Sequence, residues 1–194
     1  MLAEAAKLLD RNGFGKVALM DVAGAAGIPR GSAYHYFRGW NHLVAELIDA
    51  HILALHERVG DADDAYAGAT PEQRLVAIAA AFLEAIRDRK AEHRVQFAAL
   101  HALPAPIADG LKRKHRWLAA RIGEAIAAAI PGLGERPELL VPATMSFMSL
   151  ASLSTLWFRE DGLLSRADYA RMMALMVVNG ARCMLGEAPA AVGA

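Results

Sequence analysis

The residues best suited to chemistry in this sequence lie close together between Arg30 and Arg38. Arginine side chains and hydroxyl groups bind phosphate oxygens, an imidazole can reach a phosphate or a base edge, and a glycine lets backbone N–H groups approach a phosphate closely. The segment is therefore a candidate DNA-binding surface. Its candidate contact residues are Arg30, Gly31, Ser32, Tyr34, His35 and Arg38.

The elements that must position these residues are two short helices predicted between Leu19 and Arg38, joined by a tight turn. Val22 and Ala26 are four apart on one face of the first helix, and Ala33 and Tyr36 are expected to face inward from the second. Gly27 falls where the chain leaves the first helix, a place that often needs the left-handed conformation that glycine adopts readily. This spacing predicts a helix-turn-helix, whose second helix enters the major groove.

A longer stretch, residues 2–44, resembles the N-terminal domain of the TetR family of transcriptional repressors. The matching pieces are Asn12-Gly13-Phe14, Asp21-Val22-Ala23, Ala26-Gly27-Ile28, Arg30-Gly31-Ser32, Tyr34-His35-Tyr36-Phe37 and Leu43. The resemblance adds Tyr36 to the DNA-binding residues. It implies a homodimer whose two N-terminal heads bind a palindromic operator in double-stranded DNA and whose body binds an effector.

The sequence departs from the family pattern at three places. Val17 and Ala18 stand where relatives carry a Ser or Thr cap, at an expected cost of about 1 kcal/mol. Pro29 stands where a serine is usual, although its fixed φ suits a helix start. Trp40 replaces a lysine that binds a phosphate in relatives, so Arg38 is expected to supply that contact.

Composition limits the classes of function. The chain has 194 residues with a formal net charge of zero, and 55% of them are hydrophobic, so DNA attraction must come from local placement rather than from a general basic excess. The single cysteine, Cys183, excludes an internal disulfide, fits a reducing cytoplasm and is expected to be buried. No leader segment is recognised, which also predicts a cytoplasmic protein.

Apolar periodicity predicts an all-α fold of about nine helices and no strand. A three-helix head with the helix-turn-helix, residues 1–43, would sit on a larger helical-bundle body for ligand binding and dimerisation, residues 44–194. Gly60 to Ala69 is predicted to be a loop before the body. Beyond the head, helices are expected at about 41–58, 70–89, 91–103, 107–130, 139–158 and 166–185.

Residues 139–158 carry no charge and are long enough to span a membrane. Serine and threonine residues interrupt the segment and no other segment resembles it, which favours a buried helix in a core or a subunit interface and no membrane association. With the apolar face from Tyr169 to Gly180, it predicts a homodimer built on the last two helices.

The body offers large apolar side chains with scattered polar groups, including His93, His101 and His115, as a pocket for a mostly apolar effector would require. The candidate ligand-binding residues are Phe97, His101, Trp117, Met145, Met148 and Trp157. No catalytic set, cofactor motif or metal-ligand spacing is recognised, so we expect no enzyme, no cofactor and no metal. The interpretation favoured is a ligand-responsive repressor. The alternative is a helical small-molecule or lipid carrier whose DNA-binding head has decayed.

Overall fold

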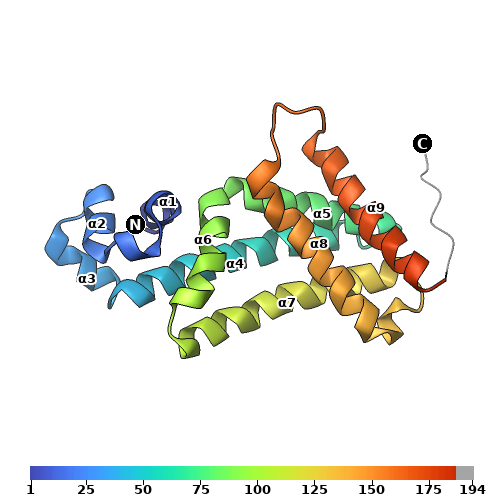
Figure 1. Ribbon diagram of the computed structural model, residues 1–194, viewed down its shortest axis with the longest axis horizontal. Helices are drawn as coiled ribbons and strands as arrows, with labels where there is room; N and C mark the ends of the chain where they lie inside the picture. Colours follow the sequence, from blue (N-terminus) through green and yellow to red (C-terminus); the bar gives the residue numbers. More distant parts are fainter. Residues whose placement is uncertain (187–194) are drawn as a thin grey trace. The chain divides into compact units, whose positions relative to one another are not determined.

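The computed structural model describes residues 1–186, which form nine α-helices and no strand. Figure 1 labels these helices along the chain. The all-α prediction is confirmed. The helices are α1 (Leu2–Asn12), α2 (Leu19–Ala25), α3 (Ala33–Tyr36), α4 (Trp40–Ala65), α5 (Pro71–Asp88), α6 (Lys90–Ala102), α7 (Ala105–Ala129), α8 (Pro137–Trp157) and α9 (Arg166–Met184), with short 3-10 turns at Phe14–Lys16, Arg30–Ser32 and Leu133–Glu135.

The chain divides into two compact units. Unit 1 comprises residues 1–54 and 88–116, and unit 2 comprises residues 55–87 and 117 onward. The sequence-predicted boundary at residue 43 stays a prediction, because a contact-based division of the chain does not test where a domain can fold alone.

Unit 1 combines the three N-terminal helices with α6, the first part of α4 and the first part of α7. Helix α6 packs on α1, and Arg94 of α6 forms an ion pair with Asp10 of α1. Its core mixes side chains of the N-terminal helices with those of α4, α6 and α7, because each amphipathic helix buries one apolar stripe. The core residues from the later helices include Leu47, Ile48, Ile52, Val95, Ala99 and Leu111.

Unit 2 is a helical bundle in which α8 and α9 lie side by side. The Tyr169 hydroxyl donates to the Leu150 carbonyl at 2.8 Å, and a Cβ at Gly123 would lie 3.1 Å from Thr144 Oγ1, so glycine permits the close approach of α7 to α8. Within residues 1–186, α8 is the one helix long and apolar enough to cross a membrane, judged by length and composition. Only 33% of its apolar window is buried within this single chain, so α8 is not covered by its own core, and burial in a subunit interface stays a prediction.

Two sequence expectations fail in unit 2. The predicted loop from Gly60 to Ala69 is helical as far as Ala65, since α4 continues. Asp63 supports this extension by accepting hydrogen bonds from Arg74 and from Arg121 Nε, the latter at 2.9 Å. Cys183 was expected to be buried on the last helix, but it lies at the exposed surface of α9.

We predict that Asp63→Asn lowers the free energy of unfolding by about 3 kcal/mol, because it leaves two arginine side chains without their shared buried carboxylate. Hydrogen bonds from Arg74, and then from Arg121, hold the pKa of that carboxyl below its usual value. Chemical denaturation measures the effect. Asp61→Asn removes the same charge from an exposed position of α4 and is the control; equal losses in both variants would contradict the prediction.

Candidate functional site

The first candidate site is the helix-turn-helix, which begins at Ala18. The usual side-chain cap is absent there, but the Asp21 carboxylate accepts a hydrogen bond from the Ala18 N–H at 2.8 Å, which is one half of a capping box. Val17 is buried in the unit 1 core. The departure at Val17 and Ala18 therefore costs one capping bond and leaves the start of α2 defined.

The turn between the helices depends on Gly27, whose φ is +67°. The N–H of Ile28 donates to the Ala23 carbonyl at 2.9 Å and so closes the end of α2. An L-residue in this conformation is strained, which is the reason a glycine is required. The sequence prediction of a left-handed residue at Gly27 is confirmed.

The second helix is short, with a 3-10 turn at Arg30–Ser32 followed by α3. Val22, Ala23 and Ala33 are fully buried, and their small size allows α3 to lie close to α2. Tyr36 is 63% exposed, so the expectation that it faces inward is wrong. Phe37 takes the inward position, because the chain turns to an extended conformation at that residue after a single helical turn.

The residues left at the surface form a compact polar face. Tyr34, His35, Tyr36 and Arg38 are exposed, Gly31 is exposed on the preceding turn, and Ser32 is half-buried. The Arg30 side chain lies outside what the structure describes. This face presents hydroxyls, an imidazole and a guanidinium on one short element, a set that can bind phosphates and base edges.

The second candidate site is a group of three buried polar side chains in unit 1, which we call the polar cluster: His51 of α4 and His93 and Gln96 of α6. Their exposed fractions are 0%, 1% and 1%. His51 Nε2 and His93 Nδ1 lie 3.0 Å apart in a hydrogen bond. Their other ring nitrogens and both polar atoms of the Gln96 side chain have no hydrogen-bond partner. Each such buried atom costs about 1–3 kcal/mol, so the cluster is poorly accounted for as packing alone.

Burial keeps both histidines of the cluster neutral. Desolvation lowers the pKa of His51 to about 3 and that of His93 to about 4, and the nearby His115 of α7 adds to both shifts. Arg89 contributes further to the shift at His51. The cluster therefore presents uncharged hydrogen-bonding groups at neutral pH.

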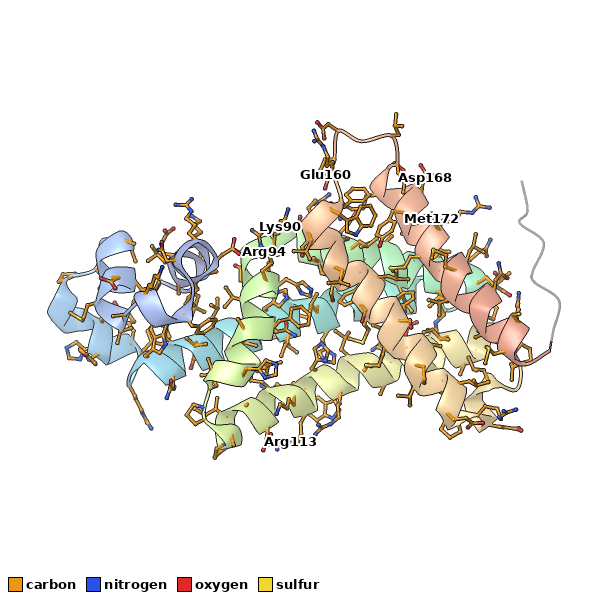
Figure 2. The ribbon with its side chains drawn as sticks, viewed as in Figure 1. Lys90, Arg94, Arg113, Glu160, Asp168 and Met172 are labelled. Atoms are coloured by element: carbon orange, nitrogen blue, oxygen red, sulfur yellow. The ribbon has the colours of Figure 1, made fainter. Side chains whose placement is uncertain are left out.

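A third feature is an apolar groove of about 520 Å³ between α8 and α9. Its walls include Pro142, Ala143 and Leu150 of α8 and Met176, Gly180 and Met184 of α9. Around it the two helices expose large apolar side chains: Val141, Met145, Leu153, Leu156, Trp157, Met172, Met176 and Met184. Figure 2 labels Met172 on α9. An exposed apolar face of this kind is typical of an interaction surface.

The structure divides the six sequence-predicted ligand residues between the units. Phe97 and His101 are exposed on α6 of unit 1, and Trp117 is exposed on α7. On α8, Met145 and Trp157 are exposed, whereas Met148 belongs to the unit 2 core. Residues 1–186 form two further surface grooves besides the one between α8 and α9. None of the six predicted residues lines any of the three. Phe97 contacts the polar cluster, since its ring meets His93 edge-on at 5.4 Å.

Sequence reasoning named His93 as a possible polar group but missed its pairing with His51. The signal present was a polar residue at an inward position of an apolar stripe, as in Leu47, Ile48, His51 and Ile52. Among residues 1–186, no group of three or more His, Cys, Asp or Glu side chains is placed to hold a metal ion.

Two family models match this chain. Residues 1–47 match the model described as bacterial regulatory proteins, tetR family. Residues 68–181 match the model of the tetracyclin repressor-like C-terminal domain. The second match alone spans more than half of the chain. No curated protein matches the sequence.

Solved structures with similar folds cover nearly the whole chain. A TetR-family transcriptional regulator from Bordetella parapertussis is 25% identical, with a TM-score of 0.82 over 92% of both chains. The ketosteroid transcriptional regulator KstR2 of Mycobacterium tuberculosis is 24% identical, with a TM-score of 0.73 over 92% of this chain and 91% of its own. AibR, solved in complex with isovaleryl coenzyme A and operator DNA, is 20% identical, with a TM-score of 0.76 over 90% of this chain and 94% of its own.

Proposed function

This chain belongs to the TetR family of bacterial regulatory proteins, and we propose that it is a transcriptional repressor that binds a palindromic operator and is released by a mostly apolar small molecule. Members of this family are transcriptional regulators rather than enzymes. A regulator of this kind works on chromosomal DNA, so we place it in the cytoplasm. The observation that carries the proposal is the compact polar face on the second helix of the motif.

The DNA contacts follow from the chemistry of this face. Arg38 would bind a phosphate, and the hydroxyls of Tyr34 and Tyr36 with the His35 imidazole would reach phosphates or base edges. The backbone N–H groups near Gly31 and the Ser32 hydroxyl would hold a second phosphate. Arg30 completes the proposed DNA-binding residues.

A palindromic operator requires two heads related by a two-fold axis, so we propose a homodimer. The exposed apolar side chains of α8 and α9 support it, because a self-complementary patch buries the same surface on both subunits. This interface also accounts for the apolar character of α8 without a membrane.

The effector is proposed to be mostly apolar. Two structural relatives support a small-molecule ligand for this fold: one is a ketosteroid regulator, and the other was solved with isovaleryl coenzyme A. Phe97, His101, Trp117, Met145, Met148 and Trp157 remain the proposed ligand-binding residues. A ligand that binds the DNA-free conformation more tightly by about 1–3 kcal/mol would weaken operator binding by up to two orders of magnitude.

Selection of duplexes from a random DNA pool tests the function. We expect an inverted repeat to emerge, and Arg38→Ala to weaken its binding by at least about tenfold and to lower the salt-dependence slope by about two, because each head of the homodimer loses one phosphate contact. Tyr34→Ala should also alter the selected bases if its hydroxyl reads a base edge. Fluorescence anisotropy at several salt concentrations measures the operator affinity and its salt dependence.

Arg11→Ala is the matched control, since Arg11 is exposed on α1 and this substitution removes the same charge. Its binding should equal that of the unmodified protein. A protein that selects no sequence over random duplex at physiological salt would overturn the repressor and favour the small-molecule carrier.

A further inference from the structure

The polar cluster places three polar side chains in the apolar core of unit 1. Its three side chains lie in the same core as Ile48, Ile52 and Val95, where apolar residues would pack without unpaired atoms. Four polar atoms of the cluster are buried and without partners. Buried polar groups in proteins are nearly always hydrogen-bonded, so these atoms indicate a partner that binds from outside the chain.

The hydrogen bond between the two histidines determines what that partner must offer. If His51 Nε2 donates, its Nδ1 is an acceptor and His93 Nε2 carries a proton. If His93 Nδ1 donates, the two roles exchange. In either tautomer the pair presents one donor and one acceptor, and the Gln96 amide presents both kinds.

The charge of the partner is restricted as well. Among residues 1–186, the one buried carboxylate, Asp63, belongs to unit 2, so unit 1 has none. An anion in the cluster would have only Arg89 near His51, which is partly exposed and already donates to the Ala50 carbonyl at 3.4 Å, and a cation would have no buried carboxylate. A neutral group avoids both desolvation penalties.

We propose that the polar cluster anchors the effector by binding a neutral group that both donates and accepts hydrogen bonds, such as the alcohol or primary amide of an otherwise apolar molecule. The inference rests on the proposed function and names the chemical class of its ligand. The three grooves described for residues 1–186 do not reach the cluster, so such a molecule would have to separate α6 from α4 to enter the apolar core around it. Phe97, which contacts His93 and is half-exposed, links the cluster to the surface of unit 1.

The same helix connects the cluster to the DNA-binding head. His93 and Gln96 point into the core from α6, while Arg94 between them pairs with Asp10 of α1. Figure 2 shows Arg94 on α6 beside α1. A molecule that separates α6 from α4 at the cluster therefore also displaces α6 from its packing on α1, within one compact unit.

Four probes of equal chain length test the class of ligand: hexan-1-ol, hexanamide, hexanoate and hexylammonium. The full-length protein is labelled at histidine and followed by NMR at pH 7.5. We expect hexan-1-ol and hexanamide to shift two buried imidazole signals saturably at millimolar concentration. The two charged probes should bind at least tenfold more weakly.

Gln96→Leu removes two of the four unpaired atoms and replaces the side chain with one of similar volume. We expect this variant to melt at a higher temperature than the unmodified protein and to bind hexanamide at least tenfold more weakly. His42→Phe, on the same helix as His51 but outside the cluster, is the control and should retain binding. Failure of both neutral probes to shift the signals would overturn the inference, and a lowered melting temperature for Gln96→Leu would then indicate ordered water as the only partner of the cluster.

The outcome can be separated from that of the proposed function by selecting DNA sequences with the same preparations. Selective DNA binding with no response to the neutral probes would overturn this inference and leave the repressor standing. Saturable binding of the neutral probes without any DNA selection would support the cluster as a ligand site and overturn the repressor.

Discussion

Met176→Glu is expected to turn the proposed homodimer into a monomer and to abolish tight operator binding. Met176 is 55% exposed on α9 and lines the apolar groove. Two-fold symmetry would bury two glutamates in one apolar interface, so we expect dimer affinity to fall by more than a hundredfold, which corresponds to about 3 kcal/mol. A single head then binds only one half-site. Sedimentation velocity measures the first effect, and fluorescence anisotropy with the selected operator measures the second.

Leu163→Glu provides the matched control for this prediction. Leu163 is fully exposed in the loop between α8 and α9, so the same charge is introduced in the same unit outside the groove. This variant should remain dimeric and bind DNA normally. If Met176→Glu also stayed dimeric with unchanged operator affinity, the interface would not include the α8 and α9 face.

Acidification is expected to destabilise the protein steeply below pH 6.5 through the two buried histidines. Their pKa values in the folded chain, about 3 for His51 and about 4 for His93, lie below the ordinary value of 6.5. Between the folded pKa values and 6.5, the unfolded chain binds more protons than the folded chain does. The free energy of unfolding therefore falls as the pH falls through this range. We expect the pair to contribute a loss of about 2 kcal/mol from pH 6 to pH 5.

Chemical denaturation of the double variant His51→Leu/His93→Leu at several pH values tests this assignment. The variant should lose most of the pH dependence between pH 6.5 and 4.5, because it has no buried imidazole to protonate. His101→Leu, which removes an exposed imidazole from α6, should keep the full dependence. The same acid profile in the double variant and the unmodified protein would assign the effect to other groups.

The helix-turn-helix could be predicted because its determinants are local. Gly27, Val22 and Ala33 act within a few residues of one another, so their spacing carries the geometry. The position of Tyr36 could not be predicted from periodicity, since α3 makes only one turn before Phe37 leaves the helical path. A period of 3.6 residues has little meaning over four residues.

Contacts between distant segments set the features that were missed. The end of α4 is held by Arg74 and Arg121, which lie 11 and 58 residues from Asp63. His51 and His93 are 42 residues apart, and neither neighbourhood in the sequence indicates the other. Polar residues within apolar stripes were the visible sign, but one sequence does not show which of them meet.

Unit 1 is built from two separate segments of the chain, and this limits the order in which the protein can fold. Its core joins residues 1–54 to apolar side chains of residues 88–116, with a segment of unit 2 between them. At typical rates of synthesis, about 5–20 residues per second, Arg116 follows Ala54 by roughly 3–12 seconds. During that interval the nascent head lacks Val95, Ala99 and Leu111, and its apolar face is open to other chains or to chaperones. A head excised at residue 47 would expose the same apolar face, so we expect a DNA-binding fragment to be more stable when it also carries α6 and the start of α7.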